Sequence, residues 1–306
     1  MKRIIMYVYG DITTDARVQR AADALSERFD VTVISKQLNK KLYSSSFKNV
    51  LVGRTDYSFR SYFRTIIEAR RIIKKEHPDI LYGHDYYSAL LLKMFLGRKS
   101  VSRIVYDAHE LYIPEKGKPF SLRSRFFYWI EKSIVNKVDL LISASQERAE
   151  RMQEHYLLSS CPVVIRNISK LTVAPEYIPE AIGKSLQEFF ELPGMTVVYA
   201  GAVIQSRRLN ELVEAVSKLA PQFKLLVVGG GSALQELKLL AQNNDSLISL
   251  FTGPVPYSAL GAILKRCDVG FIYYPVDTLN NIYCASNNCT NMQVFISLFF
   301  LMRILQ

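Results

Sequence analysis

Short apolar runs alternate with helical stripes along most of this chain, and this alternation limits the folds open to it. Residues 4–9 form an apolar run of buried-strand length, residues 15–29 carry apolar side chains at helical spacing, and residues 31–34 form the next run. Thr14 or Asp15 is suited to cap the helix. A strand, a helix and a second strand in this order predict a parallel sheet with right-handed crossovers.

The same alternation continues in two blocks. The first block predicts further helices and strands, the helices at 64–76, 88–96 and 121–137 and the strands at 79–83, 103–107, 139–144 and 162–165. After a stretch rich in proline and glycine, the second block predicts strands at 196–201, 224–228, 248–251 and 269–273 and helices at 210–219, 233–242 and 257–266. We therefore predict an α/β protein with two Rossmann-like, doubly wound domains.

The proline- and glycine-rich stretch separates the two predicted domains. The first domain covers residues 1–167, and residues 168–194 form a linker with a short helix. The second domain covers residues 195–287 and is incomplete, and residues 288–306 form a tail of a different kind. Two such domains would place a ligand cleft at the carboxyl ends of their strands.

Charge and apolar content restrict the partners of the chain. Its 306 residues carry a net charge of +11, located on helices such as residues 64–75, with no long basic arm. We therefore expect no nucleic acid as a partner. Two interpretations of the basic helices stay open: a solvated helix face, or a patch that contacts an anionic membrane. No apolar run approaches the ~20 residues that span a bilayer.

The N-terminus and the cysteines indicate the compartment. The first residues lack a small-residue cleavage site, so we interpret them as a first strand and not as a signal peptide. The four cysteines show no metal-ligand spacing and no disulfide framework, which is typical of a reducing environment. We expect a cytoplasmic protein, either free or peripheral at the inner face of the membrane.

Several strand-end motifs together resemble the GT-B glycosyltransferases of the large retaining family 4. The N-terminal part contributes Ile104-Val105-Tyr106-Asp107-Ala108-His109-Glu110 and Val164-Ile165-Arg166-Asn167. The C-terminal part contributes the segment from Gly201 to Leu209, then Val227 to Gly231 and Phe251 to Val255. The resemblance covers nearly all of residues 1–287. The chain departs from the family pattern at Arg208, where a glycine is usual, and at Ala202, where many members carry arginine.

The resemblance implies an activity and a set of site residues. It implies transfer of a sugar from a UDP- or GDP-linked nucleotide sugar to a saccharide or lipid-linked acceptor, without a bound metal or other cofactor. His109 would be the catalytic residue that contacts the transferred sugar or the acceptor, and a structural histidine is the alternative. The other expected site residues form two groups, the donor-binding Gly201, Arg207, Arg208, Gly253 and Val255, and the acceptor-binding Gly10, His84, Asp85, Asp107 and Glu110.

Arg207 is the donor-site residue that the sequence supports best. It lies between Gly201 at a strand end and a helix that begins near Asn210. This position suits a bidentate contact with phosphate, because the guanidinium and the helix N-terminus both favour an anion. A surface arginine is the alternative interpretation.

The last residues do not continue the family pattern. The family would continue after Asn287 with Pro-Asn-Lys-Leu-Tyr-Glu-Tyr-Ala, whereas the chain reads Asn-Asn-Cys-Thr-Asn-Met-Gln-Val. Back-translated one base out of phase, the codons permit Leu-Tyr-Glu-Tyr-Ala. We therefore hypothesise a one-base deletion near Asn288, which would make residues 288–306 an out-of-frame tail and remove the lysine and glutamate of the family's donor site. A natural hydrophobic tail is the alternative.

Three function classes follow from these observations. The first is a retaining glycosyltransferase of cell-surface polysaccharide or glycolipid assembly. The second is a non-catalytic truncated fragment that at most binds a sugar or a membrane. The third is a sugar-nucleotide epimerase of related fold. An NAD-dependent enzyme is disfavoured, because no GxGxxG follows the first strand.

Overall fold

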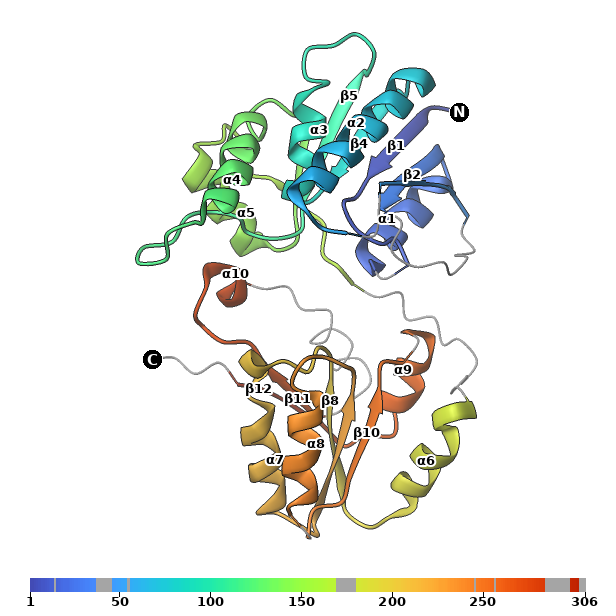
Figure 1. Cartoon of the computed structure of the whole chain (residues 1–306), viewed down its shortest axis with the longest axis vertical. Helices are drawn as coiled ribbons and strands as arrows, with labels where there is room; N and C mark the ends of the chain where they lie inside the picture. Colours follow the sequence, from blue (N-terminus) through green and yellow to red (C-terminus); the bar gives the residue numbers. More distant parts are fainter. Residues whose placement is uncertain are drawn as a thin grey trace. The chain divides into compact units, whose positions relative to one another are not determined.

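The computed structural model describes residues 1–13, 15–36, 46–53, 56–168, 180–244, 246–255, 257–283 and 298–302. The chain divides into two compact units, Met1–Arg166 and Asn167–Gln306. Each unit is built around one parallel β-sheet with helices against it (Figure 1). The α/β class and the two doubly wound sheets predicted from the sequence are confirmed.

The first unit contains a seven-stranded sheet in the order β3-β2-β1-β4-β5-β6-β7. The elements follow the chain as β1 (Arg3–Tyr7), α1 (Ala16–Ser26), β2 (Asp30–Lys36), β3 (Lys48–Val52), α2 (Phe59–Glu76), β4 (Ile80–His84), a 3-10 turn η1 (Tyr86–Ser88), α3 (Ala89–Lys93), β5 (Arg103–Ala108), α4 (Leu122–Ile134), β6 (Leu140–Ser143), α5 (Gln146–Tyr156) and β7 (Val163–Val164). The chain reverses direction across the sheet between β1 and β4, and in open α/β sheets ligands bind beside this reversal, at the carboxyl ends of the strands.

Capping residues decide where the helices of this unit begin. Asp15 caps α1, because its carboxylate accepts hydrogen bonds from the backbone N–H groups of Arg17 and Val18. Ser58 caps α2, which therefore begins at Phe59 rather than at the predicted residue 64. Ser121 caps α4 in the same way.

A buried glutamate connects α4 to the sheet and to α5. Glu131 accepts hydrogen bonds from the hydroxyl groups of Tyr106 on β5 and Tyr156 on α5, the latter at 2.9 Å. Burial raises the pKa of Glu131 to about 7, although both hydroxyl groups act to lower it. A carboxyl group whose ionisation is unfavourable therefore lies buried between α4, β5 and α5.

The pH dependence of stability should reveal this group. As the pH rises from 4.5 to about 7, the unfolded chain releases a proton that folded Glu131 retains, so stability decreases across this window. The difference between the two pKa values corresponds to about 3 kcal/mol. Glu131→Gln should therefore stabilise the protein at pH 8 by up to about 3 kcal/mol relative to its effect at pH 4, as measured by urea unfolding. Glu154→Gln, an exposed change on α5, is the control; equal pH dependence in both variants would contradict the prediction.

The second unit contains a five-stranded parallel sheet in the order β10-β9-β8-β11-β12. Its elements are α6 (Glu180–Glu191), β8 (Met195–Ala200), a 3-10 turn η2 (Gln205–Arg207), α7 (Leu209–Ser217), β9 (Phe223–Val228), α8 (Leu234–Gln242), β10 (Ser249–Gly253), α9 (Tyr257–Leu264), β11 (Val269–Tyr273), α10 (Leu279–Ile282) and β12 (Leu298–Met302). The reversal across this sheet falls between β8 and β11.

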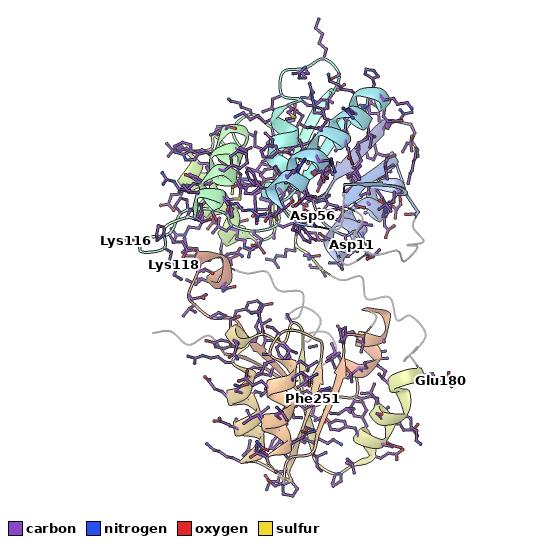
Figure 2. The ribbon with its side chains drawn as sticks, in the orientation of Figure 1. Asp11, Asp56, Lys116, Lys118, Glu180 and Phe251 are labelled. Atoms are coloured by element: carbon purple, nitrogen blue, oxygen red, sulfur yellow. The ribbon has the colours of Figure 1, made fainter. Side chains whose placement is uncertain are left out.

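Successive residues of β8 point to opposite faces of this sheet, as in any strand. Val197 and Tyr199 join the core under α7 and α8, against which Phe251 of β10 also packs (Figure 2). Val198 and Ala200 join the core under α6 and α9. The strands are thus buried on both faces, which explains their near-continuous apolar sequences.

Two segments extend what the sequence predicts for this unit. Helix α6 lies in the segment predicted as the linker, and its Leu186 and Phe189 are buried in the core of the second unit. Strand β12 lies within residues 288–306 and pairs in parallel with β11. Residues 284–297, which contain the predicted point of the frame change, are outside the described residues.

Candidate functional site

A cluster of polar side chains lies where β4 and β5 end in the first unit. The parallel register places His84 beside Asp107, and His109 follows two residues later. The Nδ1 atom of His84 is 3.0 Å from Nε2 of His109. The Oδ2 atom of Asp107 is 3.6 Å from that Nδ1 and 3.7 Å from that Nε2. The structure therefore brings together three of the residues that the sequence predicts for the site.

Asp107 is the centre of this cluster. Arg17 donates to both carboxylate oxygens, from Nη2 at 2.6 Å and from Nε at 3.2 Å, and a third nitrogen of its guanidinium donates to the carbonyl oxygen of Ile165 at 3.1 Å. The Tyr82 hydroxyl donates to Oδ2 at 3.1 Å. Arg17 and Asp107 are both buried, so each ion neutralises a charge that would otherwise be costly.

These neighbours determine the charge states of the cluster. Burial alone would raise the pKa of Asp107, but the proximity of His84, His109 and the Arg17 guanidinium holds that pKa well below its usual range. Burial lowers the pKa of His109 to about 4; Asp107 opposes this effect, and His84 and Arg17 add to it. At neutral pH, Asp107 is ionised and the ring of His109 is neutral.

The hydrogen bond between the two imidazoles selects a tautomer for each ring. One of the two facing nitrogens must carry the proton. Among the described residues Nε2 of His84 has no hydrogen-bond partner, and an N–H group buried there would be an unsatisfied donor. We therefore assign the proton to Nδ1 of His84, which leaves Nε2 of His109 as the acceptor. Neutral His109 then carries its own proton on Nδ1.

The same three side chains also have the spacing of a metal site. One donor atom from each of His84, Asp107 and His109 lies within 4.8 Å of the others. However, the Arg17 guanidinium occupies both oxygens of Asp107, and its positive charge disfavours a dication on the same carboxylate. The donor set therefore fits a hydrogen-bonded charge network better than metal ligation.

The other predicted acceptor-side residues differ in their surroundings. Asp85 has a positive φ of 59°, which is rare outside glycine, and its N–H donates to the carbonyl oxygen of Asp107 at 2.9 Å. Its Oδ1 is buried without a hydrogen-bond partner among the described residues, and burial raises the pKa of this carboxyl group well above its usual range. Glu110 is exposed, and Gly10 accepts a backbone hydrogen bond from Lys36. A side chain at Gly10 would meet only ordinary contacts.

Two members of the cluster, Arg17 and Tyr82, were not predicted from the sequence. Arg17 lies in the first turn of α1, two residues after the capping Asp15 and next to the apolar residue Val18. A cation beside this apolar stripe was a sign that its side chain could have a buried partner. Tyr82 lies two residues before His84 on β4, and this spacing places both side chains on one face of the strand. Their rings stack with centroids 4.6 Å apart.

In the second unit, three strand-end loops are held together through glycines. The backbone of Gly201 to Val203 lies against that of Gly229 to Gly231, with Val203 donating to the Gly230 carbonyl oxygen at 2.9 Å. A Cβ atom at Gly229 would lie 1.9 Å from the carbonyl oxygen of Gly201. Glycine is therefore required at position 229, and the loop after β8 keeps a defined path towards η2.

Arg207 ends that path at the point where the sheet reverses. Its Nη1 donates to the carbonyl oxygen of Tyr273, at the end of β11, at 3.1 Å. Its guanidinium carbon lies 3.9 Å from the ring centroid of Tyr274. These two contacts use one face and one N–H of a group that has five N–H donors, so a preoriented cation remains able to bind an anion.

Arg208 differs from Arg207 in its backbone conformation and in its ion pair. Its backbone is left-handed, with φ of 50° and ψ of 38°, which explains why a glycine suits this position. Its side chain is exposed and pairs with Glu211, with 3.5 Å between Nε and Oε1. The two adjacent arginines, both predicted for the donor site, contact Tyr273 in different ways, Arg207 through its carbonyl oxygen and Arg208 over its ring, with 5.6 Å between the guanidinium carbon and the ring centroid.

Gly253 and Val255 lie at the end of the neighbouring strand β10. The carbonyl oxygen of Gly253 accepts a hydrogen bond from Gly229 at 2.9 Å, and Val255 packs against the core under α6 and α9. Gly253 has a positive φ of 72° and open space around its Cα. Their backbone thus belongs to the same group of strand-end loops as Gly201.

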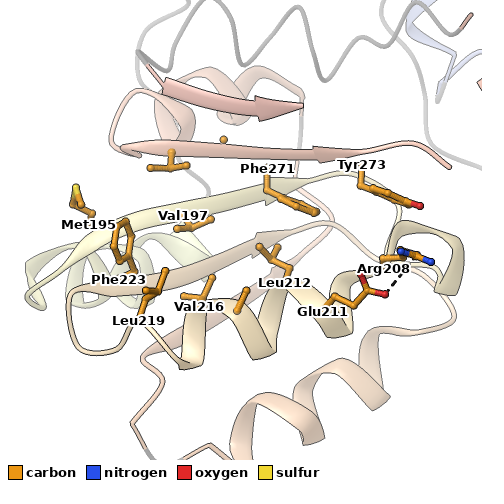
Figure 3. A pocket seen from close by; sticks show the side chains of 13 residues that line it. Met195, Val197, Arg208, Glu211, Leu212, Val216, Leu219, Phe223, Phe271 and Tyr273 are labelled. Carbon is orange, nitrogen blue, oxygen red and sulfur yellow. Dashed lines mark ion pairs between the residues drawn. The ribbon is translucent and has the colours of Figure 1, made fainter. Parts of the chain in front are cut away.

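An apolar pocket of about 660 Å³ lies between α7 and strands β8 and β11 (Figure 3). Its charged lining residues are Arg208 and Glu211, which neutralise each other. The other lining residues are Met195, Val197, Leu212, Ala215, Val216, Leu219, Phe223, Val269, Gly270, Phe271 and Tyr273. This apolar lining does not suit a diphosphate.

The chain belongs to glycosyltransferase family 4. Residues 16–168 match the model of that family, described as Glycosyltransferase Family 4. The matched segment contains the whole cluster of Arg17, Tyr82, His84, Asp107 and His109. No curated protein matches the chain.

Solved structures show the same GT-B fold at low sequence identity. Anabaena HepE in complex with UDP and glucose has a TM-score of 0.63 and 14% identity, over 89% of this chain and 74% of that one. Sucrose-phosphate synthase from Thermosynechococcus elongatus has a TM-score of 0.68 and 17% identity, over 89% and 75%. WaaG, a glycosyltransferase involved in lipopolysaccharide biosynthesis, has a TM-score of 0.61 and 15% identity, over 88% and 74%.

Proposed function

We propose that this chain transfers a sugar from a UDP- or GDP-linked nucleotide sugar to a saccharide or lipid-linked acceptor, in the assembly of cell-surface polysaccharide or glycolipid. The observation that carries the proposal is Arg207, held at the reversal of the second sheet of a family 4 chain. The likeness to HepE bound to UDP and glucose and to the lipopolysaccharide transferase WaaG supports the donor class and the kind of product. Family membership also favours transfer over epimerisation.

The proposed chemistry requires stabilisation of a departing diphosphate. Arg207 supplies a fixed positive charge, and the first turn of α7 supplies backbone N–H groups directed towards an anion. Glu211 lies in that first turn, but its charge is balanced by Arg208. The loops at Gly201 and Gly253 would present backbone groups to the nucleoside. We expect this step to proceed without a bound metal, and therefore to persist in EDTA.

The first unit is assigned to the acceptor side. His109, neutral at pH 7, would contact the transferred sugar or the acceptor through its ring, which is partly exposed. Asp85 stays on the acceptor side as a residue that directly follows His84 at the end of β4. We propose a cytoplasmic location, because the four cysteines show no disulfide framework.

Binding and turnover can be tested together. Calorimetric titration with UDP, GDP, UDP-glucose and GDP-mannose should show saturable binding for one nucleotide class, and the matching nucleotide sugar should release nucleoside diphosphate on incubation. Absence of binding to every nucleotide sugar would instead support the non-catalytic alternative.

Arg207→Met should weaken nucleotide binding by about 10- to 100-fold, because a hydrogen bond to a charged group contributes about 1.5–3 kcal/mol. Arg207→Lys should recover part of the loss, since it retains the charge but not the planar fork. Isothermal calorimetry with UDP or GDP measures both. Arg266→Met is the matched control, because Arg266 also stacks on an aromatic ring, that of Phe190 at 4.2 Å. Equal losses of nucleotide affinity in the Arg207 and Arg266 variants would contradict the assignment of Arg207 to the donor site.

We also propose that residues 288–306 are out of frame, which would leave the donor site without a lysine and a glutamate. The pairing of β12 with β11 is compatible with this, because an apolar segment of any origin can add to an exposed strand edge. Sequencing of the locus tests the idea directly; an intact frame without a recoverable motif downstream would contradict it. If the frame is shifted, restoring it should increase transfer while leaving the Arg207 dependence unchanged.

A further inference from the structure

Helix α2 exposes an unusual set of side chains. Every exposed residue along its length is either a large hydrophobe or a cation, namely Phe59, Phe63 and Ile67 together with Arg60, Arg64, Arg71, Lys74 and Lys75. At 100° per residue these eight positions fall on one side of the helix. The two glutamates of α2 are only partly exposed and are engaged elsewhere, Glu68 with the N–H of Gly53 and Glu76 with Arg3.

Helix α4 repeats this composition. Its exposed residues are Leu122 and Trp129 together with Arg123, Arg125 and Lys132. Leu122 is 84% exposed and Trp129, the single tryptophan of the chain, is 59% exposed. The only acidic residue of this helix is the buried Glu131. The loop that leads from β5 into α4 adds the exposed Lys116 and Lys118 near its tip (Figure 2).

The two helices contact each other through aromatic rings, so their exposed sides adjoin. The ring of Phe126 on α4 lies 5.3 Å from that of Phe59 and 6.0 Å from that of Phe63 on α2. On α4 the Lys132 amine lies 5.5 Å from the centroid of the Trp129 ring. We call the exposed residues of α2 and α4 the basic aromatic face.

Another helix of the same unit shows that this composition is not general. The exposed residues of α5 are Gln146, Glu147, Glu150, Arg151 and Glu154, a polar set in which acids outnumber cations. A face meant only for water would be expected to resemble α5. The basic aromatic face instead combines exposed apolar area with positive charge and lacks an exposed acid throughout α2 and α4.

We propose that the basic aromatic face docks the protein on an anionic lipid bilayer. Helices that lie in the plane of a membrane surface combine cations, which pair with lipid phosphates, with aromatic and leucine side chains, which enter the boundary between headgroups and acyl chains. Among the described residues no helix is long and apolar enough to cross a bilayer. Binding through surface cations and interfacial side chains is peripheral, reversible and dependent on salt.

This docking is independent of the proposed sugar transfer. It uses residues of α2 and α4, none of which belongs to the cluster around Asp107 or to the loops around Arg207. A variant that loses vesicle binding should still bind the nucleotide sugar, and a variant that loses sugar transfer should still bind vesicles.

Trp129 reports on docking directly, because it is the single tryptophan and lies on the face. With unilamellar vesicles containing about one-third phosphatidylglycerol in phosphatidylcholine, we expect a blue shift of its emission, quenching by brominated acyl chains, and release on raising the salt. Vesicles of phosphatidylcholine alone should give little blue shift and little quenching. Unchanged emission with the anionic vesicles would overturn the proposal.

A charge-matched pair of variants locates the site. Each cation near an anionic surface changes membrane partitioning about five-fold, so Arg60→Gln, Arg64→Gln and Arg71→Gln combined should lower vesicle binding by about 100-fold. The control removes three exposed cations elsewhere, Lys93→Gln, Lys99→Gln and Lys218→Gln, and should lose less than ten-fold. Sedimentation with the same vesicles measures both, and circular dichroism verifies folding.

Two results would refute the assignment. Equal losses in the two triple variants would show that only total charge matters. Loss of single-stranded RNA binding in the α2 variant, with vesicle binding unchanged, would make the face a nucleic-acid site.

Discussion

Asp107→Asn is expected to lower the free energy of unfolding of the first unit by about 3–5 kcal/mol, because it leaves the buried guanidinium of Arg17 without its counter-charge. Arg17 is 9% exposed and Asp107 is 3% exposed, and their closest atoms are 2.6 Å apart. Solvent therefore cannot replace the lost partner. Urea unfolding measures the change, and hydrogen exchange of the strand amides shows that it concerns the first unit.

Two further variants separate this effect from general disturbance. Glu154→Gln breaks an exposed pair with Arg151 at 3.0 Å and should cost less than about 1 kcal/mol. Arg17→Met combined with Asp107→Leu removes both charges, so it should be less destabilising than Asp107→Asn alone. If the double variant were as unstable as the sum of its single changes, the pair would not be the cause.

His109→Ala is expected to reduce sugar transfer by about 100-fold or more, while nucleotide binding by the second unit stays within about two-fold. The reason is that a side chain that assists proton movement or polarises a hydroxyl contributes about 10²- to 10⁴-fold. Rates of transfer and calorimetric titration on the same preparation separate the two effects. A parallel loss of nucleotide affinity would show that His109 acts on folding or on the donor.

The pH profile tests the environment of His109 as well as its presence. Since its pKa is lowered to about 4, its ring stays neutral from pH 8 down to about pH 5, and transfer should not lose activity near pH 6.5 through this residue. His84 contributes to lowering the pKa of His109, so His84→Ala should move the acid limb to higher pH. An unmoved limb would mean that His84 only fills space. Ring ¹⁵N shifts of His109 would show directly which nitrogen carries the proton.

The regular elements were predictable where the local pattern is strong. The buried strands β1, β4, β5, β8, β9 and β11 are apolar runs bounded by polar or glycine residues, and both sheets were expected from them. Strand β3 and helix α5 were not predicted. Strand β3 is a short edge strand, and α5 has only Ala149, Met152 and Tyr156 as buried apolar residues, so neither carries a pronounced period.

The candidate site was predictable only in part, because the local sequence pattern indicates strand ends but not contacts between distant segments. His84, Asp107 and His109 follow predicted parallel strands, and the ends of such strands converge at one edge of a sheet. Arg17 was missed because it comes from α1, 90 positions before Asp107 in the chain. Arg207 and Arg208 are indistinguishable as neighbours in sequence, yet only Arg207 donates a hydrogen bond to the carbonyl oxygen of Tyr273, whereas Arg208, with its left-handed backbone, pairs with Glu211 and lies over the Tyr273 ring.

The sequence by itself determined the two α/β units, the family resemblance and the strand ends at which chemistry is expected, because these depend on periodicity and on residues close together in the chain. Only the tertiary structure decided which charges are paired. It joined Arg17 to Asp107, set the ring of His84 against that of His109, and turned the exposed sides of α2 and α4 into one basic aromatic face. Each of these depends on segments that are distant in sequence and are brought together by the crossovers of the sheet.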